Sequence, residues 1–213
     1  RNIFNEVNNT SNNVAISADA GEINLLDGAA AGTLASSKAV IYSSADIVTG
    51  SAFAGIKTDG SVITWGSSNA GGDSSAVADQ LAEVQSISAT ANAFAAIKAD
   101  GSVVTWGSSR TGGDSVQIAD KLIGVQSISA TAGAFAALKA DGSVVVWGDA
   151  SYGGDSSFIA GQLTDVQFVS ANSFAFAAVK NDGSVVIWGN ANYGGFAQDT
   201  TGLVPGGRTI TLK

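Results

Sequence analysis

Short apolar runs, separated by Gly, Asp and Ser, follow one another in a fixed order along most of this chain. One complete unit contains three of them, at residues 84–90, 93–98 and 102–106. Each run is too short for a typical helix and is rich in Val, Ile, Phe, Thr or Trp, the composition typical of β-strands. The pattern therefore predicts three short strands in every unit.

Both faces of these strands carry apolar side chains. Phe94, Ala96 and Lys98 have one parity in their run, whereas Val104 and Trp106 oppose Val103 and Thr105 in the next. We expect both faces to be covered. A unit of this size cannot bury two faces by itself, so it must pack against neighbouring units.

The order of the runs repeats every 41 residues, and each repeat contains Asp-Gly-Ser-Val, two further residues and Trp-Gly. A fixed period of this length is the signature of propellers and solenoids. Glycine after Asp supplies the positive φ of a tight hairpin turn. The predicted structural core of the repeats consists of these tryptophans and turn glycines: Trp65, Trp106, Trp147, Trp188, Gly60, Gly101, Gly142 and Gly183.

The segments that flank these strands are less regular. Each Trp-Gly leads into a glycine-rich loop and then an apolar segment such as 77–81, which we expect to be a fourth, edge-like strand or a short helical turn. In the last unit Phe196 replaces the loop Asp, and residues 207–211 align with 166–170. The tail is therefore predicted to be a terminating strand.

Residues 1–45 lack the repeat. The Asn-rich stretch 8–13 is predicted to be a loop or linker, and 14–18 and 38–42 are β-like runs. We divide the chain into an N-terminal linker or oligomerisation segment, residues 1–45, and a four-unit β repeat domain, residues 46–213. The fold class is all-β with propeller-like blades; a β-solenoid and an intertwined trimeric β fibre are the alternatives.

The sequence from residue 46 onward resembles the regulator of chromosome condensation type repeat, through the Ala-Leu-Lys-x-Asp-Gly-x-Val-x-x-Trp-Gly core at residues 137–148. That resemblance implies four-stranded blades in a β-propeller, usually of seven blades. The family's His before the second strand is absent, and its Gly-Gln-Leu-Gly has become Gly-Gly-Asp-Ser. Four units could close into a ring, join copies from other chains, or stack.

The N-terminal segment is similar to a module of bacteriophage tail fibres, through Gly-Glu-Ile-Asn-Leu-Leu-Asp-Gly at residues 21–28 and the run at 37–41. The resemblance implies an intertwined trimeric stalk. We therefore expect a homo-oligomer, with a trimer favoured.

The amino-acid composition disfavours several classes of catalytic site, metal site and partner. Without Cys or His, the chain lacks thiol nucleophiles, thiolate metal sites and the commonest general base. A formal net charge of −8 disfavours nucleic acid and anionic membranes, and no apolar run approaches the ~20 residues of a membrane helix. No metal or other cofactor is expected.

Candidate sites have simpler structural interpretations. The tryptophans could stack on carbohydrate, but packing between repeats is favoured. The repeated lysines, one per unit, are expected to lie beside the turn Asp.

Each Gly-Gly-Asp loop offers one carboxylate where calcium needs six to eight oxygens. Asp79, Asp120 and Glu83 could be paired carboxylates of a glycosidase, but they recur only partly.

A binding surface is expected where the repeats differ most, in loops 67–70, 108–111, 149–152 and 190–193, and its predicted members are Arg110, Tyr152 and Tyr193. The first functional hypothesis is a non-enzymatic structural or receptor-binding protein of a phage fibre, on the virion surface or extracellular, whose partner is a host-surface glycan or protein. The alternatives are a bacterial adhesin, a propeller-type protein-binding or inhibitor module and, least favoured, a glycan-degrading enzyme.

Overall fold

The computed structural model describes residues 7–9, 14–16 and 50–195. The chain divides into two units, Arg1–Val40 and Ile41–Lys213. In the first, strand β1 (Val7–Asn9) pairs antiparallel with β2 (Val14–Ile16). The prediction of a loop for residues 8–13 is therefore wrong for Asn8 and Asn9. The reason is that ladder hydrogen bonds involve backbone groups, which Asn offers as any residue does. The fibre-like phrase at 21–28, the run at 38–42 and the tail at 207–211 lie outside the described residues.

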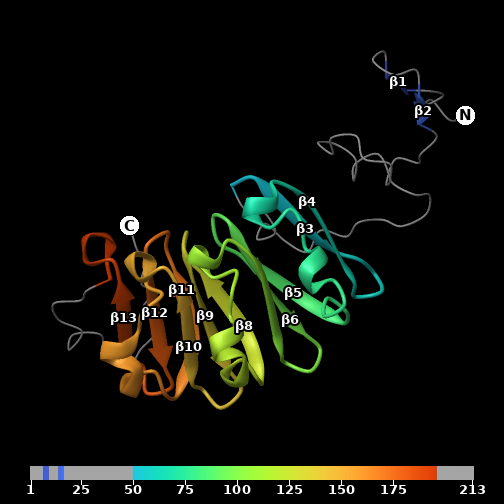
Figure 1. Cartoon of the computed structure of the whole chain (residues 1–213). Helices are drawn as coiled ribbons and strands as arrows, with labels where there is room; N and C mark the ends of the chain where they lie inside the picture. Colours follow the sequence, from blue (N-terminus) through green and yellow to red (C-terminus); the bar gives the residue numbers. More distant parts are fainter. Residues whose placement is uncertain (1–6, 10–13, 17–49, 196–213) are drawn as a thin grey trace, which may run out of the picture. The chain divides into compact units, whose positions relative to one another are not determined.

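The described part of the second unit is all-β and built from repeated antiparallel sheets, which confirms the predicted fold class (Figure 1). Its first described sheet is a hairpin, and the next three are three-stranded meanders. The strands are β3 (Ala52–Ile56) and β4 (Val62–Gly66); β5 (Val84–Ala89), β6 (Ala93–Lys98) and β7 (Val103–Gly107); β8 (Val125–Ala130), β9 (Ala134–Lys139) and β10 (Val144–Gly148); and β11 (Val166–Ala171), β12 (Ala175–Lys180) and β13 (Val185–Gly189).

Strands of one repeat pair with each other, and the sheets stand side by side in chain order (Figure 1). This is the arrangement of propeller blades. In the alternative β-solenoid, strands of successive repeats would pair instead.

Short 3₁₀ turns stand where the resemblance implied a fourth strand, so the described blades have three strands at most. These turns are η2 (Ser75–Val77), η4 (Val116–Lys121) and η6 (Ser157–Gln162). A further set of 3₁₀ turns follows each Trp-Gly: η1 (Ser68–Ala70), η3 (Ser109–Thr111), η5 (Ala150–Tyr152) and η7 (Ala191–Tyr193). The Gly-Gly-Asp sequence explains the difference. Asp73 Oδ1 accepts a hydrogen bond from the N–H of Ser75 at 2.9 Å, which favours a turn over an extended strand.

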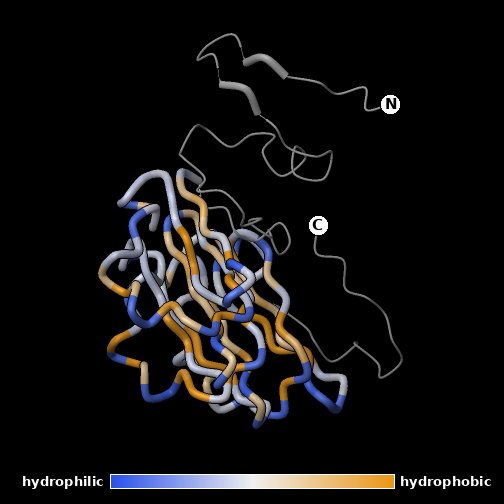
Figure 2. Tube along the Cα trace, turned by 90° about the vertical axis from the view of Figure 1, so that its right-hand side faces the viewer, coloured by the Kyte–Doolittle hydropathy of each residue, from blue (hydrophilic) through white to orange (hydrophobic). Residues whose placement is uncertain are grey.

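The core lies between the blades. On β6, Phe94 and Ala96 pack toward the preceding repeat with Ala52 and Ala54, while Ala93 and Ala95 pack toward the following one. Both faces of the middle strand are therefore buried, as the apolar pattern predicts. Figure 2 shows apolar stretches along the strands and hydrophilic positions at the turns between them.

The first strands of successive blades are linked directly. Ser88 Oγ on β5 donates to the carbonyl of Ile128 on β8 at 2.9 Å, and Ser129 Oγ on β8 donates to that of Val169 on β11 at 2.7 Å. Side chains thus satisfy backbone carbonyls at strand edges that no described strand covers.

Candidate binding surface

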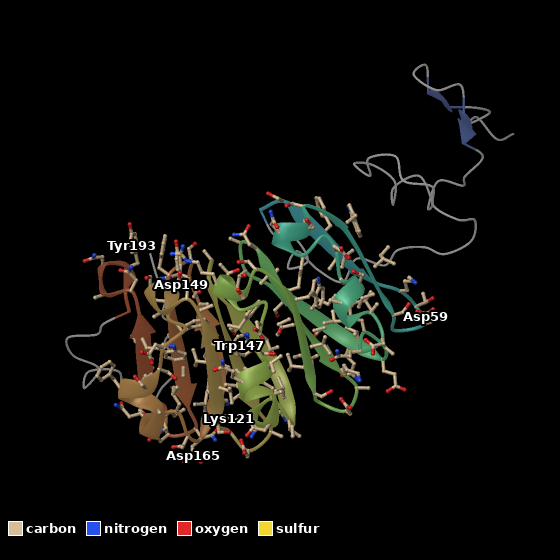
Figure 3. All side chains as sticks on the ribbon, viewed as in Figure 1. Asp59, Lys121, Trp147, Asp149, Asp165 and Tyr193 are labelled. Atoms are coloured by element: carbon tan, nitrogen blue, oxygen red, sulfur yellow. The ribbon has the colours of Figure 1, made fainter. Side chains whose placement is uncertain are left out.

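All the Trp-Gly loops lie at one end of the sheets, which we call the Trp-Gly edge. It comprises residues 67–70, 108–111, 149–152 and 190–193, together with the turns before each middle strand at 91–92, 132–133 and 173–174. The Asp-Gly turns lie at the opposite end. Figure 3 shows Asp149 and Tyr193 on the first edge, and Lys121 and Asp165 on the other.

Three aromatic rings from two repeats stack in a row along the Trp-Gly edge. The ring centroids of Tyr152 and Phe174 are 5.3 Å apart, and those of Phe174 and Tyr193 are 4.2 Å apart. Phe174 therefore joins the two tyrosines that the sequence singled out. Tyr193 is 54% exposed, and the other two rings are half-buried.

Phe174 was missed by sequence reasoning, although a signal was present. The equivalent positions of the other repeats hold Ser51, Asn92 and Gly133, all small or polar. A large aromatic that breaks the repeat in a turn has no place in the repeated core. Such a residue is a candidate for contact with another molecule.

Local structure holds Tyr152 in its place. Asp149 Oδ1 accepts from the N–H of Ser151 and so caps turn η5, of which Tyr152 is the last residue. Thr131 Oγ1 donates to the Tyr152 carbonyl at 2.9 Å. A Cβ at Gly133 would lie 2.8 Å from the Tyr152 ring, so glycine there leaves the space that the ring fills.

Tyr193 is held in the same way. Asn190 Oδ1 accepts from the N–H of Asn192 and caps turn η7, and Asn172 Nδ2 donates to the Tyr193 carbonyl at 2.9 Å. Side chains of the same repeat thus fix the backbone of each tyrosine, so less conformational entropy would be lost when a partner binds.

Arg110, the third predicted residue, forms an ion pair. Its Nε lies 3.0 Å from Asp149 Oδ2, and its side chain is 82% exposed. The pKa of Asp149 is lowered, first by the hydrogen bond from the Ser151 N–H and then by Arg110. The carboxylate therefore stays charged at neutral pH, and Arg110 is bound to the turn that carries Tyr152.

The predicted structural residues lie in the repeated core. Trp106, Trp147 and Trp188 are buried and donate through Nε1 to the carbonyls of Gly71, Gly112 and Gly153 in the preceding repeat. Trp65 is half-buried. The turn glycines have φ of 77°, 78°, 78° and 83° at Gly60, Gly101, Gly142 and Gly183.

The repeated lysines are half-buried and lie beside the turn aspartates. Lys139 Nζ is 3.6 Å from Asp141 Oδ2, and the charges of Lys98 and Lys180 contribute to the lowered pKa of Asp100 and Asp182.

The carboxylates considered for catalysis are scattered. Asp79, Asp120 and Glu83 are all exposed, and Glu83 occupies a turn position with a φ of 56°. Within residues 50–195 no group of three or more acidic side chains is placed to hold a metal ion. Nor is any helix in the described ranges long and apolar enough to cross a membrane.

Two of the other exposed apolar side chains lie in turns away from the Trp-Gly edge. Phe158 in η6 is 95% exposed and Val116 in η4 is 81% exposed, but they occupy different repeat positions and make no ring stack among the described residues. The groove along the first strands is lined by Ser and Ala side chains together with Ile128 and Val169.

Comparison with solved structures identifies the fold. Yeast RCC1 (Prp20), solved with Kap60 bound, is similar with a TM-score of 0.51 and 17% identity, over 70% of this chain and 44% of its own. The described repeats share the RCC1 propeller fold. Human WBSCR16 has a TM-score of 0.48 and 15% identity, over 65% of this chain and 45% of its own. The CRINKLY WD40 ectodomain of the Arabidopsis thaliana receptor kinase ACR4 has a TM-score of 0.43 and 19% identity, over 66% of this chain and 47% of its own.

The chain spans less than half the length of each of these structures. No family model matches the sequence, and no curated protein matches it. The likeness to RCC1 concerns the fold, so function must be argued from the residues of this chain.

Proposed function

We propose that the repeat domain is a propeller-type module that binds a protein partner on its Trp-Gly edge. The observation that carries this proposal is the row formed by Tyr152, Phe174 and Tyr193. These rings offer a continuous apolar strip on turns whose backbone is already fixed. Yeast RCC1, which has the same fold, was solved with a protein, Kap60, bound to it.

The chemistry of this edge suits a protein surface. Aromatic residues and Arg are enriched at the centres of protein interfaces, and Arg110 lies beside the aromatic row through its ion pair with Asp149. The formal net charge of −8 favours a protein over a nucleic-acid partner. The partner should present apolar side chains to the rings and a charged or amide group to Arg110.

This surface acts by binding and not by catalysis in our proposal. Its ionisable pair is Arg110 and Asp149, and a carboxylate with a lowered pKa is a poor proton donor near neutral pH.

A second candidate is a receptor-binding domain displayed by a trimeric virion fibre or by a bacterial adhesin. Two observations favour it: the fibre-like phrase at residues 21–28, and the exposed ring of Tyr193, which could stack on a sugar. A host-surface glycan or protein would then be the ligand, and the location would be the virion surface or extracellular.

The two candidates are separated by a binding screen with matched variants. The full chain is presented to a displayed peptide and protein library and to a glycan array. Binders are then retested on Tyr193→Ala, Arg110→Ala and the control Phe158→Ala, which removes an exposed ring elsewhere. We expect protein ligands that lose about tenfold or more in affinity with the first two variants and little with the control. Selective glycan binding lost in Tyr193→Ala would support the receptor-binding candidate instead.

The proposed trimer is tested by light scattering on the full chain and on a version lacking residues 1–45. A trimer that becomes a monomer on truncation would support the stalk. The same number of chains per particle in both versions would exclude the stalk.

A further inference from the structure

The Trp-Gly edge carries one positive and one negative side chain, and only the positive one is exposed. In the loops and turns that define this edge, every residue other than Arg110 and Asp149 is uncharged. The side chain of Asp149 is 12% exposed, whereas that of Arg110 is 82% exposed. A chain with a formal net charge of −8 therefore presents an exposed cation on the edge that carries the aromatic row.

The covered carboxylate orients the exposed guanidinium. Asp149 Oδ1 accepts from the N–H of Ser151, and Asp149 Oδ2 accepts from Arg110 Nε at 3.0 Å. The Nη groups of Arg110 make no hydrogen bond to the described residues. Their donors lie in one plane and match the two oxygens of a carboxylate. Because Asp149 offsets part of the positive charge, the fit of this planar group matters more than net charge in selecting a ligand.

The aromatic row presents ring edges beside this guanidinium. The planes of Tyr152 and Phe174 differ by 17°, and those of Phe174 and Tyr193 differ by 20°. Phe174 stacks on both tyrosines, so its half-buried ring is open at its edge. Ring edges carry partial positive charge. They suit apolar side chains and acidic oxygens, whereas a sugar ring packs against a ring face.

Backbone groups of the same loops are already used. The N–H groups of residues 111–113 donate to carbonyls of their own loop, and those of residues 152–154 do the same one repeat later. Successive free N–H groups are what captures the terminal carboxylate of a peptide. The loops therefore favour the side-chain carboxylate of an Asp or Glu within a partner chain.

We propose that the partner contacts this edge through a segment with an Asp or Glu side chain, which binds the Nη groups of Arg110, and with apolar side chains that lie along Tyr152, Phe174 and Tyr193. This inference rests on the proposed protein-binding function and specifies the partner's chemistry. Arg110 pairs with the first residue of loop 149–152, Tyr152 is the last residue of that loop, and Tyr193 belongs to the next repeat. The carboxylate and the apolar side chains therefore occupy opposite ends of the segment.

An array of short synthetic peptides tests this chemistry with the full chain. The peptides have variable apolar residues on either side of one fixed position, which is Glu in the first series, Gln in the second and Lys in the third. Gln matches Glu in shape but has no charge. The wild-type chain, Arg110→Gln, Arg110→Lys, Tyr193→Ala and the control Phe158→Ala are applied to all three series.

We expect the wild-type chain to bind Glu peptides about tenfold or more tightly than their Gln counterparts, because hydrogen bonds to charged groups are the stronger ones. Arg110→Gln should abolish this preference without changing the weaker binding of Gln peptides. Arg110→Lys should restore it only in part, since Lys lacks the planar group. Tyr193→Ala should weaken binding in all series, and Phe158→Ala should match the wild type.

The outcomes separate this inference from the proposed function. Peptide binding that depends on Tyr193 but does not distinguish Glu from Gln would overturn the acidic segment and leave the protein-binding edge intact. A Glu preference that persists in Arg110→Gln would overturn the role of Arg110. If no series binds, the inference also fails, and the screen of displayed proteins decides the proposed function by itself.

An acidic glycan is the other source of a carboxylate, so sialyllactose is tested as a ligand of the same chains. We expect it not to bind, because the inner rings of the row offer edges and not faces. Binding of sialyllactose that is lost in Arg110→Gln, without binding of Glu peptides, would overturn the assignment of a protein segment.

Discussion

Each buried tryptophan both fills space and donates a hydrogen bond across the boundary between two repeats. Trp106 is 4% exposed, stacks on Phe94 and donates to the Gly71 carbonyl at 3.0 Å. The ring therefore stabilises two repeats at once, because Phe94 belongs to its own repeat and Gly71 to the one before.

Trp106→Ala should lower the free energy of unfolding by about 3 to 5 kcal/mol, since it removes a large buried ring. Trp106→Phe keeps most of the ring but leaves the Gly71 carbonyl without its donor, so it should cost less, about 1 to 3 kcal/mol. Urea unfolding followed by circular dichroism measures both. A loss below about 1 kcal/mol for the alanine variant would mean that the ring is not part of the core.

The turn aspartates give the protein a predictable response to acid. The pKa of Asp141 is lowered, chiefly by the Ser143 hydroxyl and next by the Ser143 N–H. A carboxyl group whose pKa is lower in the folded state contributes stability above its unfolded pKa. That contribution is lost as the pH falls through the folded pKa.

Ser143→Ala should therefore raise the pKa of Asp141 toward its usual 3.8, as a carboxyl NMR titration would record. The variant should have a lower Tm than the wild type at neutral pH, and the gap should close as the pH falls below 3.8 and the carboxylate takes up a proton. Ser68→Ala, an exposed serine in η1, should not move the Asp141 titration. A Tm gap that persists unchanged in acid would show that the hydroxyl acts by packing.

At the scale of elements, the glycine loops decide how closely two blades approach. Gly112 has a φ of 97°, and a Cβ there would lie 2.6 Å from the Phe135 ring. Gly124 also has a positive φ, 68°, but nothing lies within 4 Å of its Cβ position. Equivalent positions in other repeats hold Glu83 and Asp165, both with φ of 56°. Substitutions at Gly112 and Gly124 can therefore measure the cost of a steric clash separately from the cost of backbone strain.

Gly112→Ala should destabilise the fold by about 2 to 4 kcal/mol, because it adds a clash with a buried ring to the strain of a left-handed residue. Gly124→Ala should cost only the strain, about 1 kcal/mol. Thermal or urea unfolding compares the two. Equal losses would mean that the Phe135 ring moves aside without cost and that the glycine loop does not set the spacing.

At the scale of the whole molecule, stability depends on contacts between neighbouring repeats, since each sheet by itself leaves two apolar faces open. Phe135 lies at an internal boundary and is 0% exposed, whereas Phe53 lies on the first described sheet and is 41% exposed. The same residue type therefore occurs in the same repeat position with and without a preceding described blade.

Phe135→Ala should lower the free energy of unfolding by about 3 to 5 kcal/mol. It should also speed hydrogen exchange in β6 and β9, on both sides of the boundary. Phe53→Ala should cost less and leave the exchange of β9 unchanged, because its ring is partly exposed and stacks on Trp65 of its own blade. A similar loss for both variants at a concentration where the chain is monomeric would contradict this order.

The sequence by itself determined what depends on near neighbours. The 41-residue period, the strands and the Asp-Gly turns were all predictable. A hairpin is closed by residues adjacent in the chain, and each strand is a short run rich in β-branched and aromatic residues. Arg110, Tyr152 and Tyr193 could be chosen because they vary in loops where the core does not constrain them. The choice between a fourth strand and a 3₁₀ turn was left open, because both suit a short apolar segment.

Only the tertiary structure decided which of these residues meet. Phe174 joins Tyr152 to Tyr193, and Arg110 reaches Asp149 39 residues later in the chain. Such contacts depend on how one blade is placed on the next, and that placement follows from the packing of buried rings against glycine loops. The repeat pattern predicts that neighbours exist, but the distance between them is set by the volume of the side chains at the boundary.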